Sequence, residues 1–391
     1  MDIKLKSKIE NDRYTEYVYD AFDIQNKEET EVVVSFNLEE IKSFDWNIGV
    51  ILGSSGSGKT TILNKLGELS VSNFDHNKPL ISNFDWLEPN EATKLLTSIG
   101  LSSVPTWLRP FRLLSNGEQY RAELAYKVGK AKDGDVVLVD EYTSVVDRDV
   151  AKAMSFALQK YIRRENKRIV LASCHYDILE WLMPDWTCSP QKGGVLERGD
   201  YLRQGRPQIA LQVSRTEADT WSLFKKHHYL TEERNKGFGH LVFEWNSKPV
   251  GIIVYKNQPS GTIKNGYAIS RVVVLPDYQG MGVGSKICEA FGGMIKSLGG
   301  RTFIKTINPA LGGYFNKSKN WKPTSKNGKY RADIKGDNKK YSNLLNRTSY
   351  CHEYIGDLLE GYENLLLPVR QMREEKNKKE LNALTLFNGT N

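Results

Sequence analysis

The sequence predicts an α/β protein built from two successive domains, and three observations support this prediction. A chain of 391 residues is longer than a single hydrophobic core usually organises. Apolar strand patterns alternate with helical patterns in both halves of the chain. Each half also holds a glycine-rich turn between an apolar run and a helix-forming stretch, at residues 53–60 and 279–284.

The boundaries between the domains follow from composition. The stretch SPQKGGVLERGDYLRQGRPQ is rich in glycine, proline and charge, which is typical of a connection between domains. The last segment reads as helical until Pro368 interrupts the pattern. We therefore expect a first α/β domain, a linker, a second α/β domain and a helical tail, over residues 1–195, 196–206, 207–345 and 346–391.

The overall composition is that of a soluble globular protein, with 39% apolar and 26% charged residues. The four cysteines show neither paired nor metal-binding spacing, which favours a reducing compartment. The first residues contain no apolar signal segment, and no run of about 18 apolar residues occurs. We expect a cytoplasmic protein with no membrane partner.

Positive charge is concentrated in one segment of the second domain. Residues 301–347 contain twelve Lys and Arg against two acids, a local net charge of +10. Such a segment binds nucleic acid or another anionic partner in many proteins. A solvated, lysine-rich surface loop is the alternative.

The first glycine-rich turn, GSSGSGKT, fits the pattern G-x-x-x-x-G-K-[ST] of a phosphate-binding loop. Its glycines allow the backbone N–H groups to point inward, and the helix that follows favours negative charge at its N-terminus. Lys59 would reach the β and γ phosphates, and the Thr60 hydroxyl would bind Mg²⁺. The residues expected to hold the nucleotide are Gly53, Ser54, Ser55, Gly56, Ser57, Gly58, Lys59, Thr60 and Thr61.

Further polar motifs follow this loop in a fixed order. The apolar strand VVLVDE delivers Asp140 to the same Mg²⁺ ion and places Glu141 to orient or deprotonate a water. Between the two lies LSNGEQ, which contains Ser115 and Gly117. The motifs SVVD, at 144–147, and SCHYD come after the strand.

This ordered set of motifs resembles that of the ABC-type ATPases. The resemblance implies that His175, in SCHYD, is the switch histidine of the site. It also implies that Ser115 and Gly117 face the γ-phosphate bound by a second copy. Because the chain carries one such set, we expect a head-to-tail homodimer that clamps two ATP molecules.

Two departures from transporter-type ATPases argue against transport. No glutamine occurs between Ile62 and Leu114, where those proteins carry one. Lys59 and Ser115 are only 56 positions apart, which leaves room for a small helical subdomain.

The adenine ring of the nucleotide usually stacks on an aromatic side chain upstream of the phosphate loop. Tyr19, Phe22 and Trp46 compete for this role, and Phe22 is our candidate. Its alternative role is that of an ordinary core aromatic.

The second glycine-rich turn lies in RVVVLPDYQGMGVGSKI, at 271–287. It resembles the acyl-CoA motif V-x-P-x-x-[QR]-G-x-G-x-[GA] of the GNAT-superfamily acyltransferases. The resemblance implies that the strand ending near Val274 splays open to bind the pantetheine arm. A glycine-rich turn in an unrelated α/β domain is the alternative. The residues expected to hold the acyl-CoA are Val274, Gln279, Gly280, Met281, Gly282, Val283 and Gly284.

Acyl transfer to an amine needs a base for the amine and an acid for the departing thiolate. The stretch NPALGGYFNKSKNW resembles the Asn…Ala…Tyr stretch of the GNAT family and makes Tyr314 the candidate acid, with plain packing as the alternative. Many relatives carry a carboxylate on the strand before the glycines, but AISRVVV offers none. His227, His228 and Glu244 are the remaining bases; His228 is our candidate.

The whole arrangement resembles bacterial and phage-associated fusions of an ABC ATPase with a GNAT domain, and the second domain distantly resembles phage Mom-type DNA-modification proteins. The resemblance implies an ATPase and N-acyltransferase that uses acetyl-CoA or another acyl-CoA. Because transfer from a thioester to an amine is downhill, ATP would serve to clamp or open a large substrate.

The basic segment 301–347 favours a nucleic acid as that substrate, either a phage DNA base or a tRNA. Two alternatives remain open. One is an acyltransferase for a protein or small amine, gated by the ATPase. The other is a non-catalytic DNA-associated clamp with a degenerate GNAT sensor.

Overall fold

The protein is described by a computed structural model that covers residues 2–25, 29–199, 201–216, 220–227, 239–258, 263, 265–330, 348–366 and 382–385. The chain forms two compact units. The first unit joins Met1–Asp75 to Ser115–Arg206, and the second joins His76–Leu114 to Pro207–Asn391. Residues 76–114 therefore group with the C-terminal half of the chain, although they lie between two parts of the first unit.

The first unit is built on a five-stranded sheet with the strand order β4-β5-β3-β6-β7. The first four strands in this order are parallel, and β7 is antiparallel to β6. The strands are β3 (Ile48–Leu52), β4 (Val136–Val139), β5 (Arg168–Ser173), β6 (Trp186–Cys188) and β7 (Leu196–Arg198). The helices are α2 (Leu38–Lys42), α3 (Lys59–Leu66), α6 (Asn116–Lys130), α7 (Arg148–Arg164), α8 (Leu179–Leu182) and α9 (Tyr201–Gln204).

The central strand β3 is apolar because it is covered on both faces, and all five of its residues are buried. Its glycine is required by a close approach: a Cβ on Gly49 would lie 2.0 Å from the Trp186 ring. Trp186 in turn meets Trp46 edge to face within the core. This packing fixes the strand whose carboxyl end leads into the first glycine-rich turn.

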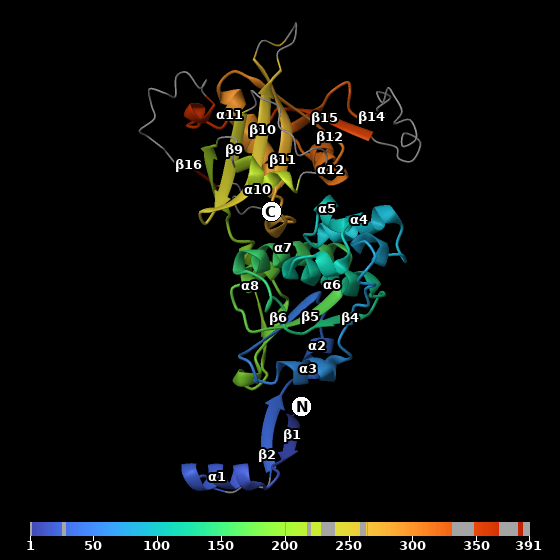
Figure 1. The fold of residues 1–391 in the computed structure, drawn as a ribbon, viewed down its shortest axis with the longest axis vertical. Helices are drawn as coiled ribbons and strands as arrows, with labels where there is room; N and C mark the ends of the chain where they lie inside the picture. The colour runs from blue at the N-terminus through green and yellow to red at the C-terminus, as the bar shows by residue number, and fades with distance from the viewer. Residues whose placement is uncertain are drawn as a thin grey trace. The chain divides into compact units, whose positions relative to one another are not determined.

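A separate antiparallel hairpin of β1 (Asp2–Lys8) and β2 (Glu29–Ser35) belongs to the first unit. Helix α1 (Arg13–Phe22) connects the two strands and lies at their outer end (Figure 1). None of its residues is buried.

The second unit contains, in its described residues, a nine-stranded sheet with the order β13-β15-β12-β11-β10-β9-β8-β16, and β14 also pairs with β15. Its strands are β8 (Ala210–Arg215), β9 (Gly239–Trp245), β10 (Lys248–Asn257), β11 (Gly266–Val274), β12 (Arg301–Thr306), β13 (Trp321–Pro323), β14 (Lys329–Tyr330), β15 (Thr348–Tyr354) and β16 (Asn382–Thr385). Its helices are α4 (Pro89–Ser98), α5 (Val104–Trp107), α10 (Trp221–Lys225), α11 (Val283–Ser297) and α12 (Pro309–Lys317).

Two neighbouring strands of this sheet part from each other. β11 pairs in parallel with β12 over Gly266–Ile269, against Arg301–Ile304. Beyond Ile269, β11 continues to Val274 and is paired there with β10 on its other side. In the described structure the last residues of β11 therefore lack β12 as a partner, and this opening lies beside the second glycine-rich turn.

The expected helical tail is not found in the described part of residues 346–391. Thr348–Tyr354 form strand β15 between β12 and β13, and Asn382–Thr385 form strand β16 beside β8. The sequence TSYCHEY of β15 is rich in residues that favour strands, and Cys351 and His352 are buried against the sheet. Local composition and pairing agree in β15, and the described residues that follow it contain a short 3-10 helix, Glu363–Leu365.

Candidate functional site

The first glycine-rich turn connects the central strand β3 to helix α3. Gly56 and Gly58 have φ angles of 76° and 95°, in the left-handed region that favours glycine. A Cβ on Gly53 would lie 2.4 Å from the Ser57 hydroxyl, and one on Gly58 would lie 2.6 Å from Val34. Three glycines of the motif are therefore required by the backbone path.

The lysine of the turn folds back over it. The Lys59 ammonium donates to the carbonyl oxygens of Gly53 and Ser54, at 2.9 and 2.8 Å, and its residue is 6% exposed. The Ser57 hydroxyl is buried and has no hydrogen-bond partner among the described residues. A buried cation beside an unsatisfied hydroxyl, at the start of a helix, fits the phosphate groups of a nucleotide.

The residues expected to hold Mg²⁺ lie together. The Thr60 hydroxyl donates to Asp140 Oδ2 at 2.6 Å. Thr60 is at the start of α3, and Asp140 directly follows β4, so the carboxyl edge of the parallel sheet brings them together. One hydroxyl and one carboxylate fit Mg²⁺, which usually retains waters and phosphate oxygens as its other ligands.

Glu141 stands next to this pair in a strained backbone conformation, with φ of 51°. Its backbone N–H donates to Asp140 Oδ1 at 2.8 Å, and its exposed carboxylate accepts from the Ser144 hydroxyl at 2.6 Å. The carboxylate is therefore oriented and open to solvent, as a group that activates a water must be.

His175 follows strand β5 at the same edge of the sheet. Its Nδ1 is 3.1 Å from the Thr143 hydroxyl. Burial, followed by the nearby Arg148 cation, lowers the pKa of His175 below its ordinary value. Arg148 itself is paired with Asp177. The imidazole is therefore neutral near pH 7.

Ser115 and Gly117, from the LSNGEQ motif, lie at the start of helix α6. Ser115 is its N-cap and forms a capping box with Glu118: the Ser115 hydroxyl accepts from the Glu118 N–H at 3.3 Å, and the Glu118 carboxylate accepts from the Ser115 N–H at 3.0 Å. Ser115 is exposed. Gly117 is held by the buried Arg121, whose Nε donates to its carbonyl at 3.1 Å. Ser115 is therefore an exposed residue at the capped N-terminus of α6, and Gly117 is half-buried behind it.

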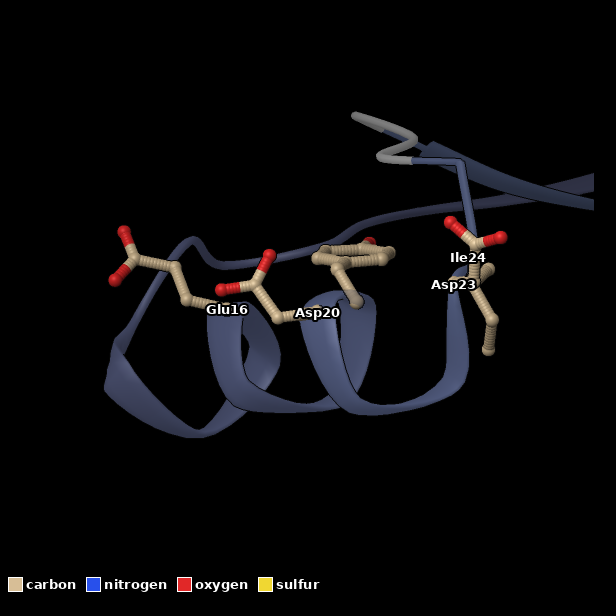
Figure 2. A pocket seen from close by; sticks show the side chains of 5 residues that line it. Glu16, Asp20, Asp23 and Ile24 are labelled. Atoms are coloured by element: carbon tan, nitrogen blue, oxygen red, sulfur yellow. The ribbon is translucent and has the colours of Figure 1, made fainter.

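Phe22 does not lie beside the phosphate loop. It ends helix α1, at the outer end of the hairpin, and is 69% exposed. The opposite end of β2 approaches the loop, where Val34 meets Gly58. The hollow on α1 is lined by Tyr19, Ile24 and three acids, and Figure 2 shows Glu16 and Asp20 one turn apart. Phe22 does not line this hollow, so the hollow does not bear on its role. The choice of Phe22 as the adenine platform stays a prediction.

The second glycine-rich turn connects β11 to helix α11. Gly280 and Gly282 have φ angles of 86° and 81°, and Gly282 caps the helix without a side-chain hydrogen bond. Met281 and Val283 are 1% and 3% exposed. Their side chains belong to the core, so the turn offers its backbone N–H groups to a ligand.

Gln279 links this turn to two other segments of the second unit. Its side-chain NH₂ donates to the Val274 carbonyl at 2.9 Å, and its side-chain oxygen accepts from the Ser102 N–H at 2.8 Å. The Val274 carbonyl is therefore already bonded. A Cβ on Gly284 would lie 3.4 Å from Val274, which is ordinary contact.

Tyr314 points from helix α12 toward helix α11. Its hydroxyl donates to Glu289 Oε1 at 2.6 Å, and the Ser318 hydroxyl donates to the same oxygen at 3.3 Å. Lys286 donates to Glu289 Oε2 at 3.0 Å. Burial, followed by the Glu289 carboxylate, raises the pKa of Tyr314 well above its ordinary value. Glu289 was missed at the sequence level, although a lone acid in the apolar stretch ICEAFGGMI signals a buried carboxylate.

The candidate bases are distributed over other elements. His228 lies outside the described residues. His227 is half-buried after α10, and its backbone N–H donates to Phe224 at 3.0 Å. Glu244 lies on β9, opposite Pro249 of β10 and Gln212 of β8.

Comparison with known proteins finds a family match in the middle of the chain. Residues 176–309 match the acetyltransferase (GNAT) family. No curated protein matches the chain.

Solved structures similar to this chain are ABC cassettes. A bacterial ABC transporter cassette, MJ0796, in its dimeric structure matches with 15% identity and a TM-score of 0.30, covering 39% of this chain and 85% of its own. The protein cbiO1 from Clostridium perfringens, part of the ABC transporter complex cbiONQ, matches with 19% identity and a TM-score of 0.32, covering 40% and 78%. TM-scores this low do not establish a shared fold. The fold of the first unit is therefore assigned from its own phosphate-binding loop and strand order.

The chain combines an ABC ATPase-like N-terminal fold with a GNAT domain, as the sequence predicted. Both parts indicate an enzyme that binds ATP and transfers acyl groups. Among the described helices, none has the length and apolar character that crossing a bilayer requires.

Proposed function

We propose that the protein is an ATP-hydrolysing N-acyltransferase that uses acetyl-CoA and modifies a nucleic acid, either a phage DNA base or a tRNA. The observation that carries the choice of substrate is a group of lysines around the C-terminal part of α12. Residues 301–330 contain seven Lys and Arg and no acid. Six of the seven are exposed and make no ion pair with a described residue: Lys305, Lys317, Lys319, Lys322, Lys326 and Lys329.

These lysines extend from β12, the strand that parts from β11, through α12 to β13 and β14. They adjoin the elements that carry Tyr314. Uncompensated positive charge next to a reaction centre attracts a phosphate backbone and brings a base to that centre.

In the first unit, Lys59 and the turn N–H groups would hold the phosphates of ATP, and Thr60 with Asp140 would hold Mg²⁺. The bound nucleotide supplies the negative charge that Ser115 and Gly117 of a second copy would contact. The exposure of Ser115 at the N-terminus of α6 supports a head-to-tail homodimer as the hydrolysing form. Glu141 would activate the water, and His175 would sense the γ-phosphate.

In the second unit, the backbone N–H groups of Gly280, Gly282 and Gly284 would bind the diphosphate of acetyl-CoA, since they open helix α11. The last residues of β11, on the side where they lack β12 as a partner, would bind the pantetheine arm. Tyr314 would then lie at the reacting thioester.

Mass spectrometry of host DNA and tRNA nucleosides tests this function directly. Cells that express the wild type are expected to contain an acylated nucleoside. Cells that express Lys59→Ala or Gly282→Glu are expected to lack it. Acylated polyamines or proteins in place of a nucleoside would contradict a nucleic acid substrate.

Binding measurements at several salt concentrations test the lysine surface. Replacing Lys317, Lys319 and Lys322 by Gln is expected to weaken binding of duplex DNA or tRNA and to reduce the salt slope of the binding constant by roughly two to three. A matched control removes the same charge from ion-paired lysines of the first unit, Lys6, Lys42 and Lys192. If the two triple variants weakened nucleic acid binding equally, the overall charge of the protein would explain the effect, and this result would contradict a binding role of the lysine surface.

One observation favours a second candidate, an acyltransferase gated by the ATPase. Ser102 belongs to residues 76–114, which lead directly into Ser115 of the LSNGEQ motif. Its backbone N–H donates to Gln279 and so links this segment to the second glycine-rich turn, where acyl-CoA is expected to bind. ATP binding at the LSNGEQ motif would then alter acyl-CoA affinity through this bond.

Calorimetry on Glu141→Gln protein tests whether ATP binding controls the affinity for acetyl-CoA. Acetyl-CoA affinity is expected to change at least about fivefold when ATP is added. Gln279→Leu and Ser102→Pro, which remove the bond, are expected to abolish that change, whereas Ser102→Ala keeps the backbone donor and preserves it. An acetyl-CoA affinity that is the same with and without ATP would contradict the gate.

A further inference from the structure

Glu289 is a buried carboxylate whose bonds all come from groups around the expected reaction centre. It is 7% exposed and lies on α11, two turns after the acyl-CoA turn. Its Oε1 accepts from the Tyr314 hydroxyl at 2.6 Å, which is a short, strong contact. A buried carboxylate must be paired and hydrogen-bonded to be tolerated, and the Lys286 ammonium at 3.0 Å provides the charge partner.

This contact changes what Tyr314 can do. A phenol that donates its proton to a carboxylate can still accept a proton through its oxygen lone pairs, which the Ser318 and Ser285 hydroxyls also approach. Its own ionisation is opposed, because a phenolate next to the carboxylate would place two negative charges together. Tyr314 alone is therefore a poor proton donor, and it becomes useful when Glu289 can exchange a proton with it.

We propose that Glu289 is the positioning residue of the acyl transfer: it orients the Tyr314 hydroxyl and exchanges a proton with it, in place of the strand carboxylate that this sequence lacks. The inference rests on the proposed acyltransferase function, and it assigns to this pair the base role for which His227, His228 and Glu244 were alternative candidates.

The proton transfers balance. As the amine nitrogen forms its bond to the thioester carbon, Tyr314 Oη accepts the proton that this nitrogen loses, and the Tyr314 proton moves to Glu289 Oε1. As the carbon–sulfur bond breaks, Tyr314 gives one proton to the departing thiolate and recovers its own from Glu289. The products are an amide and a thiol, and both residues end in their starting states.

The first test measures the interaction between Tyr314 and Glu289 without any enzymatic turnover. Tyrosinate absorbance near 295 nm is followed against pH, and subtraction of the Tyr314→Phe titration isolates Tyr314. In the otherwise wild-type protein its ionisation is expected above the ordinary tyrosine pKa of about 10. In Glu289→Gln, which keeps the side-chain shape, it is expected at lower pH. Ionisation of Tyr314 at the same pH in both proteins would overturn the inference.

The second test reads thioester consumption with acetyl-CoA and host tRNA or DNA. Glu289→Gln is expected to lower kcat about a hundredfold or more, in the range of proton-transfer catalysis, with the KM for acetyl-CoA within about threefold. Ser297→Ala removes a hydroxyl on the same helix that donates to the Met294 carbonyl; it is the control and is expected to stay within about twofold.

The pH profile separates a role in proton transfer from mere packing. The titratable groups that face Glu289 are Lys286, Cys288, Tyr314 and Tyr354. Because the carboxylate holds Tyr314 protonated, its replacement is expected to move the alkaline limb of kcat to lower pH. An unchanged limb, or full activity of Glu289→Gln, would overturn the inference. Failure of the wild type to consume acetyl-CoA would instead refute the proposed function, and the titration would still decide whether the pair exists.

Discussion

The two glycine-rich turns of this protein share their backbone and differ in their chemistry. In each, a strand leads into a turn in which a glycine in the left-handed conformation caps the following helix, Gly58 at φ 95° and Gly282 at φ 81°. Neither cap has a side-chain hydrogen bond, so both helix N-termini are open to an anion. The first turn adds a folded-back lysine, and the second adds the neutral amide of Gln279.

This difference matches what each phosphate group has to do. A phosphate that reacts develops charge in the transition state and needs a cation and a metal close by. A diphosphate that does not react needs only to be bound, and backbone N–H groups suffice for binding. The charged groups of the second site are instead Glu289 and Lys286, beside Tyr314, where the thioester is expected.

The largest predicted effect is that two single variants each lose one activity and keep the other. Lys59→Ala is expected to reduce ATP hydrolysis at least a hundredfold and leave acetyl-CoA affinity within about twofold, because the lysine serves only phosphate chemistry. Gly282→Glu is expected to abolish acetyl-CoA binding, since it places a carboxylate at the anion site, and to leave hydrolysis intact. Phosphate release and calorimetry measure the two. If either variant lost both activities while remaining folded, the two turns would not be separate sites.

The next effect concerns the dimer. Glu141→Gln protein with ATP is expected to elute as a homodimer in light-scattering chromatography, because hydrolysis is blocked and the clamp stays closed. Adding Ser115→Asp keeps a good helix cap but sets a negative charge against the γ-phosphate, and the dissociation constant is expected to rise on the order of tenfold or more.

Ser115→Asn is the control, since it caps the helix without charge. Dimers that form equally well in the Asp and Asn variants would show that Ser115 does not face a nucleotide.

A smaller effect concerns the pH dependence of hydrolysis. The lowered pKa of His175 keeps the imidazole neutral, so hydrolysis is expected to be flat from pH 8 down to the ordinary histidine pKa of about 6.5 and to fall only below it. Arg148→Gln removes a cation that opposes protonation, so the acid limb is expected to move to higher pH. Profiles of rate against pH for both proteins check this, and an acid limb that stays in place would remove His175 from the mechanism.

The sequence predicted the parts of the fold that depend on local pattern. Both turns, their flanking strands and helices, and the closeness of Thr60 to Asp140 follow from motifs in which spacing and chemistry coincide. Glu289 escaped prediction because its partner Tyr314 is 25 positions away, and helix packing alone brings them together. The hydrogen bond between Ser102 and Gln279, 177 positions apart, escaped for the same reason.

Two other features depend on pairing between distant strands. The last segment of the chain was read as helical, whereas Thr348–Tyr354 form strand β15, flanked by β12 and β13. Phe22 was chosen as an aromatic upstream of the phosphate loop, but the hairpin of β1 and β2 carries α1 to its outer end.

The smallest predicted effect separates the glycines of the second turn from one another. Gly282 has a left-handed φ of 81°, so Gly282→Ala is expected to destabilise the fold by about 1 kcal/mol and to weaken acetyl-CoA binding through the displaced N–H groups. Gly284 lies within helix α11, and a Cβ there meets Val274 at an ordinary 3.4 Å. Gly284→Ala is therefore expected to leave the affinity unchanged and to raise stability by up to about 0.5 kcal/mol, through better helix propensity. Thermal melting and calorimetry measure the pair, and a larger loss of affinity in Gly284→Ala would mean that this position, rather than the backbone turn, contacts the cofactor.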